Sequence, residues 1–82
     1  MARFYFDIVA NGHPVSADEE GMELPNLTAV QREIGRAVGE MARDELRATA
    51  ESGQPLSLAV EVRTDNGLIM RARFSFELEH LQ

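Results

Sequence analysis

The apolar residues of this chain change their spacing twice, and this change constrains the fold more than any other feature. From residue 3 to residue 9, apolar and polar side chains alternate, which is typical of a half-buried strand. From residue 27 to residue 41, apolar residues recur every three or four positions, which indicates an amphipathic helix that runs to about Glu51. The alternation then returns from residue 56 to residue 78. Two strand-forming regions therefore flank one long helix.

Turn signals divide each strand-forming region into two strands. Asn11-Gly12 is a strong hairpin dipeptide, so a short second strand is expected near Val15. Asp65-Asn66-Gly67 predicts a second hairpin in the C-terminal half. The segment 18–21 is acidic and is expected to form a loop.

The ends of the helix are marked by local signals. Proline disfavours helical geometry in the residue before it, so Leu24-Pro25 lies outside the helix, and Asn26 is a good N-cap. Gly53 is the expected stop after Glu51. The expected fold class is therefore α+β in the order β-β-α-β-β, with one long helix packed on one face of a small antiparallel sheet.

The hydrophobic core is predicted where the strand alternation and the helical stripe agree. The stripe runs from Leu27 to Met41. The centre of the core is expected to contain Phe4, Phe6, Ile34, Val38, Val60, Phe74 and Phe76.

Length, charge and composition limit the functional classes. Eighty-two residues predict one domain over residues 1–82. The net charge of −6 disfavours non-specific binding to nucleic acids and to anionic membranes. The absence of cysteine excludes disulfides, thiolate zinc sites and cysteine nucleophiles. No apolar run approaches the ~20 residues of a membrane helix and no signal sequence is evident, so a cytoplasmic protein is expected.

The acidic residues raise the alternative of a metal-dependent enzyme. These residues are Asp7, Asp18, Glu19, Glu20 and Glu23. A phosphodiester hydrolase of the RNase H type needs carboxylates that converge around metal ions. Consecutive loop acids point in different directions, so we favour solvated loop acids and assign no catalytic, cofactor-binding or metal-binding residue. No cofactor is expected.

Two surfaces are candidates for contact with a partner. One flank of the helix carries Gly35, Gly39, Ala42 and Leu46, which either pack on the protein's own sheet or meet a second subunit. The open face of the sheet is expected to carry Tyr5, Ala59, Arg63, Ile69, Arg71 and Arg73. Arginines near an aromatic ring could bind single-stranded nucleic acid, whereas cross-strand pairing with acidic residues explains them without a ligand.

The segment Asp18 to Leu27, together with the aromatic strand Phe4-Tyr5-Phe6 and the Asn11-Gly12 turn, resembles a family of short uncharacterised bacterial proteins. Its members share a D-E-E-G-x-E-L-P-D/N-L loop. The layout is more loosely similar to the antitoxin half of HicAB-type toxin–antitoxin pairs, and this similarity implies a chain that forms oligomers and covers a small protein. The family resemblance implies no known activity.

We therefore predict a small non-enzymatic interaction or regulatory module, most simply a homodimer, with a small protein as another possible partner. The two alternatives are a metal-dependent phosphodiester hydrolase of RNase H-like ancestry and a weak single-stranded nucleic-acid binder that uses the open sheet face. Nucleic acid is disfavoured as a partner, and no membrane is expected.

Overall fold

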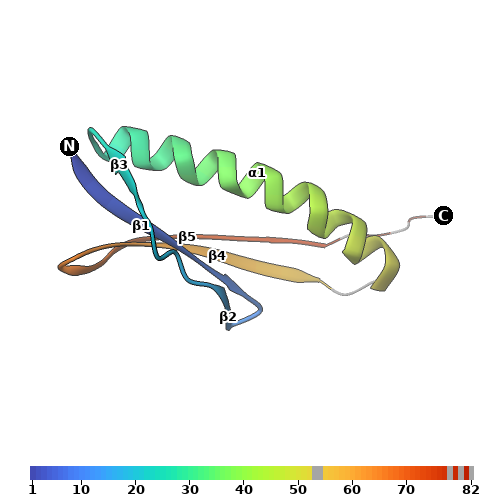
Figure 1. Ribbon diagram of the computed structural model, residues 1–82. Coiled ribbons are helices and arrows are strands. Elements are labelled where there is room, and N and C mark those ends of the chain that lie inside the picture. Colours follow the sequence, from blue (N-terminus) through green and yellow to red (C-terminus); the bar gives the residue numbers. More distant parts are fainter. Residues whose placement is uncertain (53–54, 78, 80, 82) are drawn as a thin grey trace.

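The computed structural model describes residues 1–52, 55–77, 79 and 81, and the side chains of residues 46, 48–52 and 76 lie outside that description. One helix lies along one face of an antiparallel sheet (Figure 1), so the expected α+β fold is confirmed. The elements in chain order are β1 (Ala2–Ala10), β2 (His13–Ser16), β3 (Met22–Leu24), α1 (Leu27–Ser52), β4 (Leu56–Thr64) and β5 (Gly67–Phe76).

The sheet is built around β1 and β4. Its strand order is β2-β1-β4-β5, and all pairings are antiparallel. β2 pairs with the C-terminal part of β1, where Ala10 lies opposite His13, and β3 pairs with its N-terminal part, where Phe4 lies opposite Met22. The two short strands therefore pair with the same edge of β1. β5 is the edge strand on the other side of the sheet.

The strand β3 is the one element that differs from the expected order. The predicted order β-β-α-β-β has no strand between the acidic loop and the helix. In the structure, Met22–Leu24 forms a strand there, opposite Ala2–Phe4. Three residues are too few to show an alternation of apolar and polar side chains. The order of the elements is therefore β-β-β-α-β-β.

The helix begins where its capping signal predicted. The side-chain Oδ1 of Asn26 accepts a hydrogen bond of 2.9 Å from the Ala29 backbone N–H, as an N-cap residue does. On the exposed side of α1, Arg36 forms ion pairs with Glu33 and with Glu40. The predicted stop at Gly53 lies outside the described residues.

The core lies between α1 and the sheet. Val30 of the helix and Val60 and Val62 of β4 are completely buried, and Phe4 and Ile34 join them. Phe6, Val38 and Phe74 are partly buried and pack against this cluster, as predicted. The predicted core side chain of Phe76 lies outside the described part of the structure. Leu27 is 54% exposed, so the buried stripe of the helix begins only at Val30.

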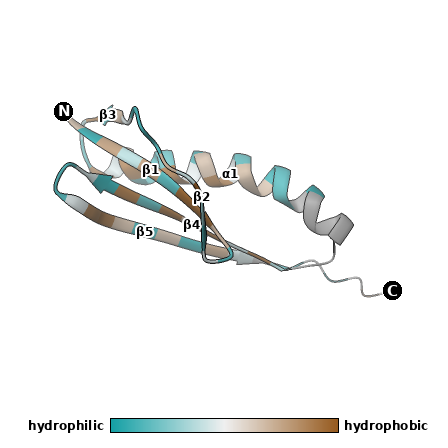
Figure 2. Ribbon diagram, turned by 60° about the horizontal axis from the view of Figure 1, so that its bottom comes forward, coloured by the Kyte–Doolittle hydropathy of each residue, from teal (hydrophilic) through white to brown (hydrophobic). Residues whose placement is uncertain are grey.

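The opposite face of the sheet is not covered by α1 (Figures 1 and 2). We call it the uncovered face. Hydrophilic and hydrophobic positions alternate along its strands (Figure 2), as expected for a sheet that is buried on one side only. Within the described residues, no helix is long and apolar enough to cross a membrane.

Candidate functional site

Asp18 fills the gap between the two short strands on the edge of β1. Its Oδ2 accepts a hydrogen bond of 3.1 Å from the backbone N–H of Phe6, a residue paired with neither β2 nor β3. Its Oδ1 accepts hydrogen bonds from the backbone N–H groups of Glu20 (3.2 Å) and Gly21 (3.0 Å). One carboxylate thus replaces a missing strand residue and also shapes the acidic loop.

Arg63 of β4 ties this loop to the uncovered face. Its Nε donates to Oδ2 of Asp7 at 2.8 Å, and its Nη2 donates to the backbone oxygen of Asp18 at 2.7 Å. The other oxygen of Asp7 accepts the backbone N–H of Asp18 at 2.9 Å. The guanidinium also lies 4.6 Å from the centre of the Tyr5 ring, within range of a cation–π interaction. We call Tyr5, Asp7, Asp18, Gly21 and Arg63 the loop anchor.

Gly21 completes the loop anchor because no larger residue fits its position. Its φ is +75°, in the left-handed region. A Cβ atom there would lie 2.9 Å from Cε1 of Tyr5 and 2.9 Å from Cγ of Arg3. The loop backbone therefore lies directly on the Tyr5 ring, at the β1 side of the uncovered face.

The surroundings of Asp18 and Arg63 in the loop anchor favour the charged forms of both side chains. Partial burial alone would raise the pKa of Asp18. The backbone N–H groups of Gly21, Phe6 and Glu20, together with the charge of Arg63, outweigh this effect and hold that pKa below its ordinary value. The hydrogen bond to Asp7 raises the pKa of Arg63, which stays charged.

Next to the loop anchor, β4 and β5 form a second pair of opposite charges. Asp7 lies opposite Glu61 across β1 and β4, and Glu61 lies opposite Arg71 across β4 and β5. Nε of Arg71 donates to Oε2 of Glu61 at 2.7 Å. The two acids of this row are therefore each paired with an arginine, as the prediction of cross-strand pairing required.

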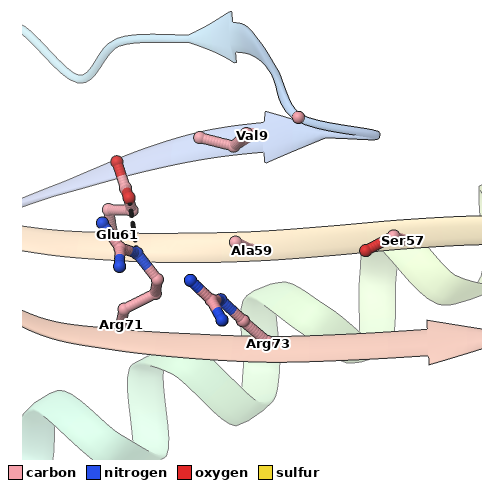
Figure 3. A pocket seen from close by; sticks show the side chains of 7 residues that line it. Val9, Ser57, Ala59, Glu61, Arg71 and Arg73 are labelled. Atoms are coloured by element: carbon pink, nitrogen blue, oxygen red, sulfur yellow. Dashed lines mark hydrogen bonds and ion pairs between the residues drawn. The ribbon is translucent and has the colours of Figure 1, made fainter.

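A shallow trough of about 420 Å³ lies beside this row, next to the β1–β2 turn. Val9, Ala59 and Arg73 form one cross-strand row of its lining, and Ser57 and Ala59 contribute small side chains. Arg71 reaches from β5 to Glu61, and Arg73 beside it points toward β4 (Figure 3). The trough is lined by Val9, Gly12, Ser57, Ala59, Glu61, Arg71 and Arg73.

The acidic residues do not form a common centre. Asp18 is used by backbone N–H groups, Asp7 by Arg63 and Asp18, and Glu61 by Arg71. Glu23 forms an ion pair of 3.3 Å with Arg3. Among the residues that the structure describes, no group of three or more histidine, aspartate or glutamate side chains is placed to hold a metal ion.

The structure divides the predicted contact residues into three groups. Tyr5 and Arg63 belong to the loop anchor, whereas Arg71 and Arg73 line the trough. On the helix flank, Gly35 and Gly39 are exposed, and a Cβ atom at either position would meet no atom within 4 Å. The two glycines therefore do not pack on the protein's own sheet. Ala42 is half-buried, and the side chain of Leu46 lies outside the described residues.

Sequence reasoning missed the structural role of Asp18 and Gly21. Both were placed in a loop whose acids were expected to be solvated, which is correct for the exposed Glu19 and Glu20. The spacing Asp-x-x-Gly carried the signal, since an aspartate often accepts backbone N–H groups two and three residues ahead and glycine supplies a positive φ. The distant contacts to Phe6 and Arg63 had no local signal.

Comparison with known proteins identifies a family. A family model described as a domain of unknown function (DUF6894) matches residues 3–75. This range contains α1, β2, β3 and β4 completely, and it lacks only Ala2 of β1 and Phe76 of β5. No curated protein and no solved structure gives a significant match. The resemblance to HicAB antitoxins therefore stays a prediction.

Proposed function

We propose that this chain, which belongs to the DUF6894 family of domains of unknown function, is a small non-enzymatic interaction module that acts as a homodimer. The observation that carries this proposal is the uncovered face. A five-stranded sheet has one side packed on α1, and the other side carries the trough and half-buried residues such as Tyr5 and Val9. Because α1 and the sheet already form two layers, a second copy on this side would add a further layer to the same sheet.

The exposed surface area of the chain supports an interface with a partner. The chain exposes 5911 Å². A folded monomer of 9.1 kDa is expected to expose about 4,900 Å². The excess of roughly 1,000 Å² is larger than the roughly 500 Å² of the uncovered face, so that face accounts for part of it.

The two alternative functions have less support. A nucleic-acid binder would stack bases on Tyr5, but the Tyr5 ring already contacts Arg63 and the backbone of Gly21. A phosphodiester hydrolase would need converging carboxylates, but Asp7 and Glu61 each lie against an arginine. A small protein partner that covers the same face remains compatible with an interaction module.

Sedimentation equilibrium at micromolar concentration tests the homodimer. We expect a mass of twice the 9.1 kDa of the chain, with dissociation on dilution. A mass of 9.1 kDa at every concentration would contradict the proposal. The non-enzymatic part is tested with a nuclease assay in magnesium or manganese. Turnover by the wild type that is lost in Asp7→Asn would contradict it.

A further inference from the structure

The uncovered face has opposite charges on its two edges. On the β1 edge, the loop carries Glu19 and Glu20, which are exposed. Within the described residues, their carboxylates form no hydrogen bond or ion pair. On the β5 edge, Arg71 and Arg73 stand two residues apart and so point to the same face.

Of the two arginines on the β5 edge, only Arg71 is paired with a carboxylate among the residues that the structure describes. Arg71 is paired with Glu61 through Nε. The cross-strand neighbour of Arg73 is Ala59, and no carboxylate lies within ion-pair distance of Arg73 among the residues that the structure describes. Arg73 therefore lies at the wall of the trough, where its guanidinium can bind a carboxylate (Figure 3).

The loop is held rigidly enough to supply such carboxylates. The loop anchor fixes its backbone through the carboxylate of Asp18 and the guanidinium of Arg63. Gly21 lies against the Tyr5 ring, so the loop backbone lies on the β1 side of the uncovered face. Ordering the backbone that carries Glu19 and Glu20 before contact lowers the entropic cost of an interface.

A two-fold arrangement of two copies would bring these two edges together. Across the uncovered face the order is loop, β1, β4, β5, so the line between β1 and β4 is its middle. A half-turn about an axis that is parallel to this line and lies above the uncovered face would place β5 of one copy over the loop of the other. Along the strands, Arg71 shares a cross-strand row with Asp7, next to Phe6, where Asp18 bonds. Arg73 lies two residues further along β5, in the row of Val9 and Ala59.

We propose that the occupant of the uncovered face is a second copy of this chain, held by Glu19 and Glu20 of each copy against Arg71 and Arg73 of the other. This inference rests on the proposed homodimer and adds its interface. In a two-fold interface each contact occurs twice, so the charge match is self-complementary. Four strand positions and about eight residues per strand give each face roughly 500 Å², and about 1,000 Å² in total is the lower limit for a specific interface.

Charge reversal tests the interface. Arg73→Glu places like charges at both contacts, and so does the double variant Glu19→Arg/Glu20→Arg. We expect each variant alone to weaken dimerisation at least about tenfold in sedimentation equilibrium, because juxtaposed like charges are strongly unfavourable. An equimolar mixture should restore the dimer, since a heterodimer regains opposite charges at both contacts. The triple variant in one chain should also dimerise.

Arg32→Glu and Asp44→Arg serve as controls, because both residues are exposed on α1, on the other side of the sheet. They should leave dimerisation unchanged, and circular dichroism should show that all variants remain folded. If the wild type is a monomer, the proposed function fails together with its interface. If the wild type is instead a dimer that persists in Arg73→Glu and in the loop variant, only the interface is wrong. The interface is also wrong if both variants are monomers and their mixture does not form a dimer.

Discussion

At the scale of single residues, the acidic loop contains two kinds of residue. Asp18 and Gly21 hold the chain in place, because one accepts three backbone N–H groups and the other lies on an aromatic ring. Glu19 and Glu20 are exposed and leave their carboxylates to solvent or to a partner. The loop backbone is therefore held by several contacts, and it carries two acids that are unpaired within the described part of the chain.

Gly21→Ala should destabilise the protein more than Gly12→Ala. Both glycines have a positive φ, so alanine costs about 1–2 kcal/mol of backbone strain at either position. Only at Gly21 would the new Cβ meet the Tyr5 ring, which should cost about 1–3 kcal/mol more. Thermal or urea unfolding of the two variants measures the difference. Equal stabilities would show that the loop does not rest on Tyr5.

Asp18→Asn should destabilise the protein in a pH-dependent manner. The folded pKa of Asp18 is lowered, so the charged carboxylate stabilises the folded state above the unfolded pKa, and this contribution is lost as the pH falls through the folded pKa. Near pH 7 the variant should lose about 1–3 kcal/mol, since an amide cannot accept hydrogen bonds at both positions.

The pH series supplies the check on that prediction. The unfolding midpoints of the wild type and of Asp18→Asn should differ fully above about pH 5 and converge below about pH 4. A constant difference between the two proteins down to about pH 2 would show that the ionised carboxylate of Asp18 is not what holds the loop.

At the scale of the elements, α1 carries two glycines that its own sheet does not require. Gly35 and Gly39 are exposed, and nothing lies within 4 Å of a Cβ at either position. Gly35→Ala and Gly39→Ala should therefore each stabilise the protein by about 1 kcal/mol, because alanine has the higher helix propensity. Thermal unfolding at low protein concentration measures this gain.

Sedimentation of the same two variants shows whether the helix flank meets a second copy. With the uncovered face as the interface, both variants should dimerise like the wild type. A loss of dimerisation in either variant would move the interface to the flank of Gly35, Gly39 and Ala42.

The edge of β5 is a less favourable contact than the uncovered face. An antiparallel pairing of two β5 strands centred on Ala72 would place Arg71 of each copy opposite Arg73 of the other. Like charges directly opposite one another destabilise a strand pair. Charged residues on an edge strand are also a common protection against edge-to-edge association.

At the scale of the whole molecule, stability depends on a small core. Only Val30, Val60 and Val62 are less than 2% exposed among the described side chains, and α1 supplies just one of them. A chain of this length is expected to have about 4–12 kcal/mol of stability. Single core substitutions can therefore remove much of the total.

Phe4→Ala should remove about 3–5 kcal/mol of stability, because Phe4 is 6% exposed and lies in the central cluster. Leu27→Ala should change it by less than about 0.5 kcal/mol, because Leu27 is 54% exposed. Urea unfolding of both variants compares a buried residue of β1 with an exposed residue of the helical stripe. A large loss in Leu27→Ala would place the start of the helix against the core.

The sequence by itself determined the elements whose signals are local. The alternation in β1, β4 and β5, the helical stripe, the Asn26 cap and the Asn11-Gly12 turn each depend on residues a few positions apart. The alternation also placed Tyr5, Arg63, Arg71 and Arg73 on one face, because side chains of a strand point to its two sides in turn.

Only the tertiary structure decided what those side chains do. Arg63 is 56 residues from Asp7 and 45 residues from Asp18, yet one guanidinium binds both. The three-residue strand β3 exists because β1 offers it an edge, and Asp18 is structural because Phe6 leaves an N–H unpaired there. Such contacts join segments that are distant along the chain, so they follow from how the sheet is assembled, and no local pattern of residues encodes them.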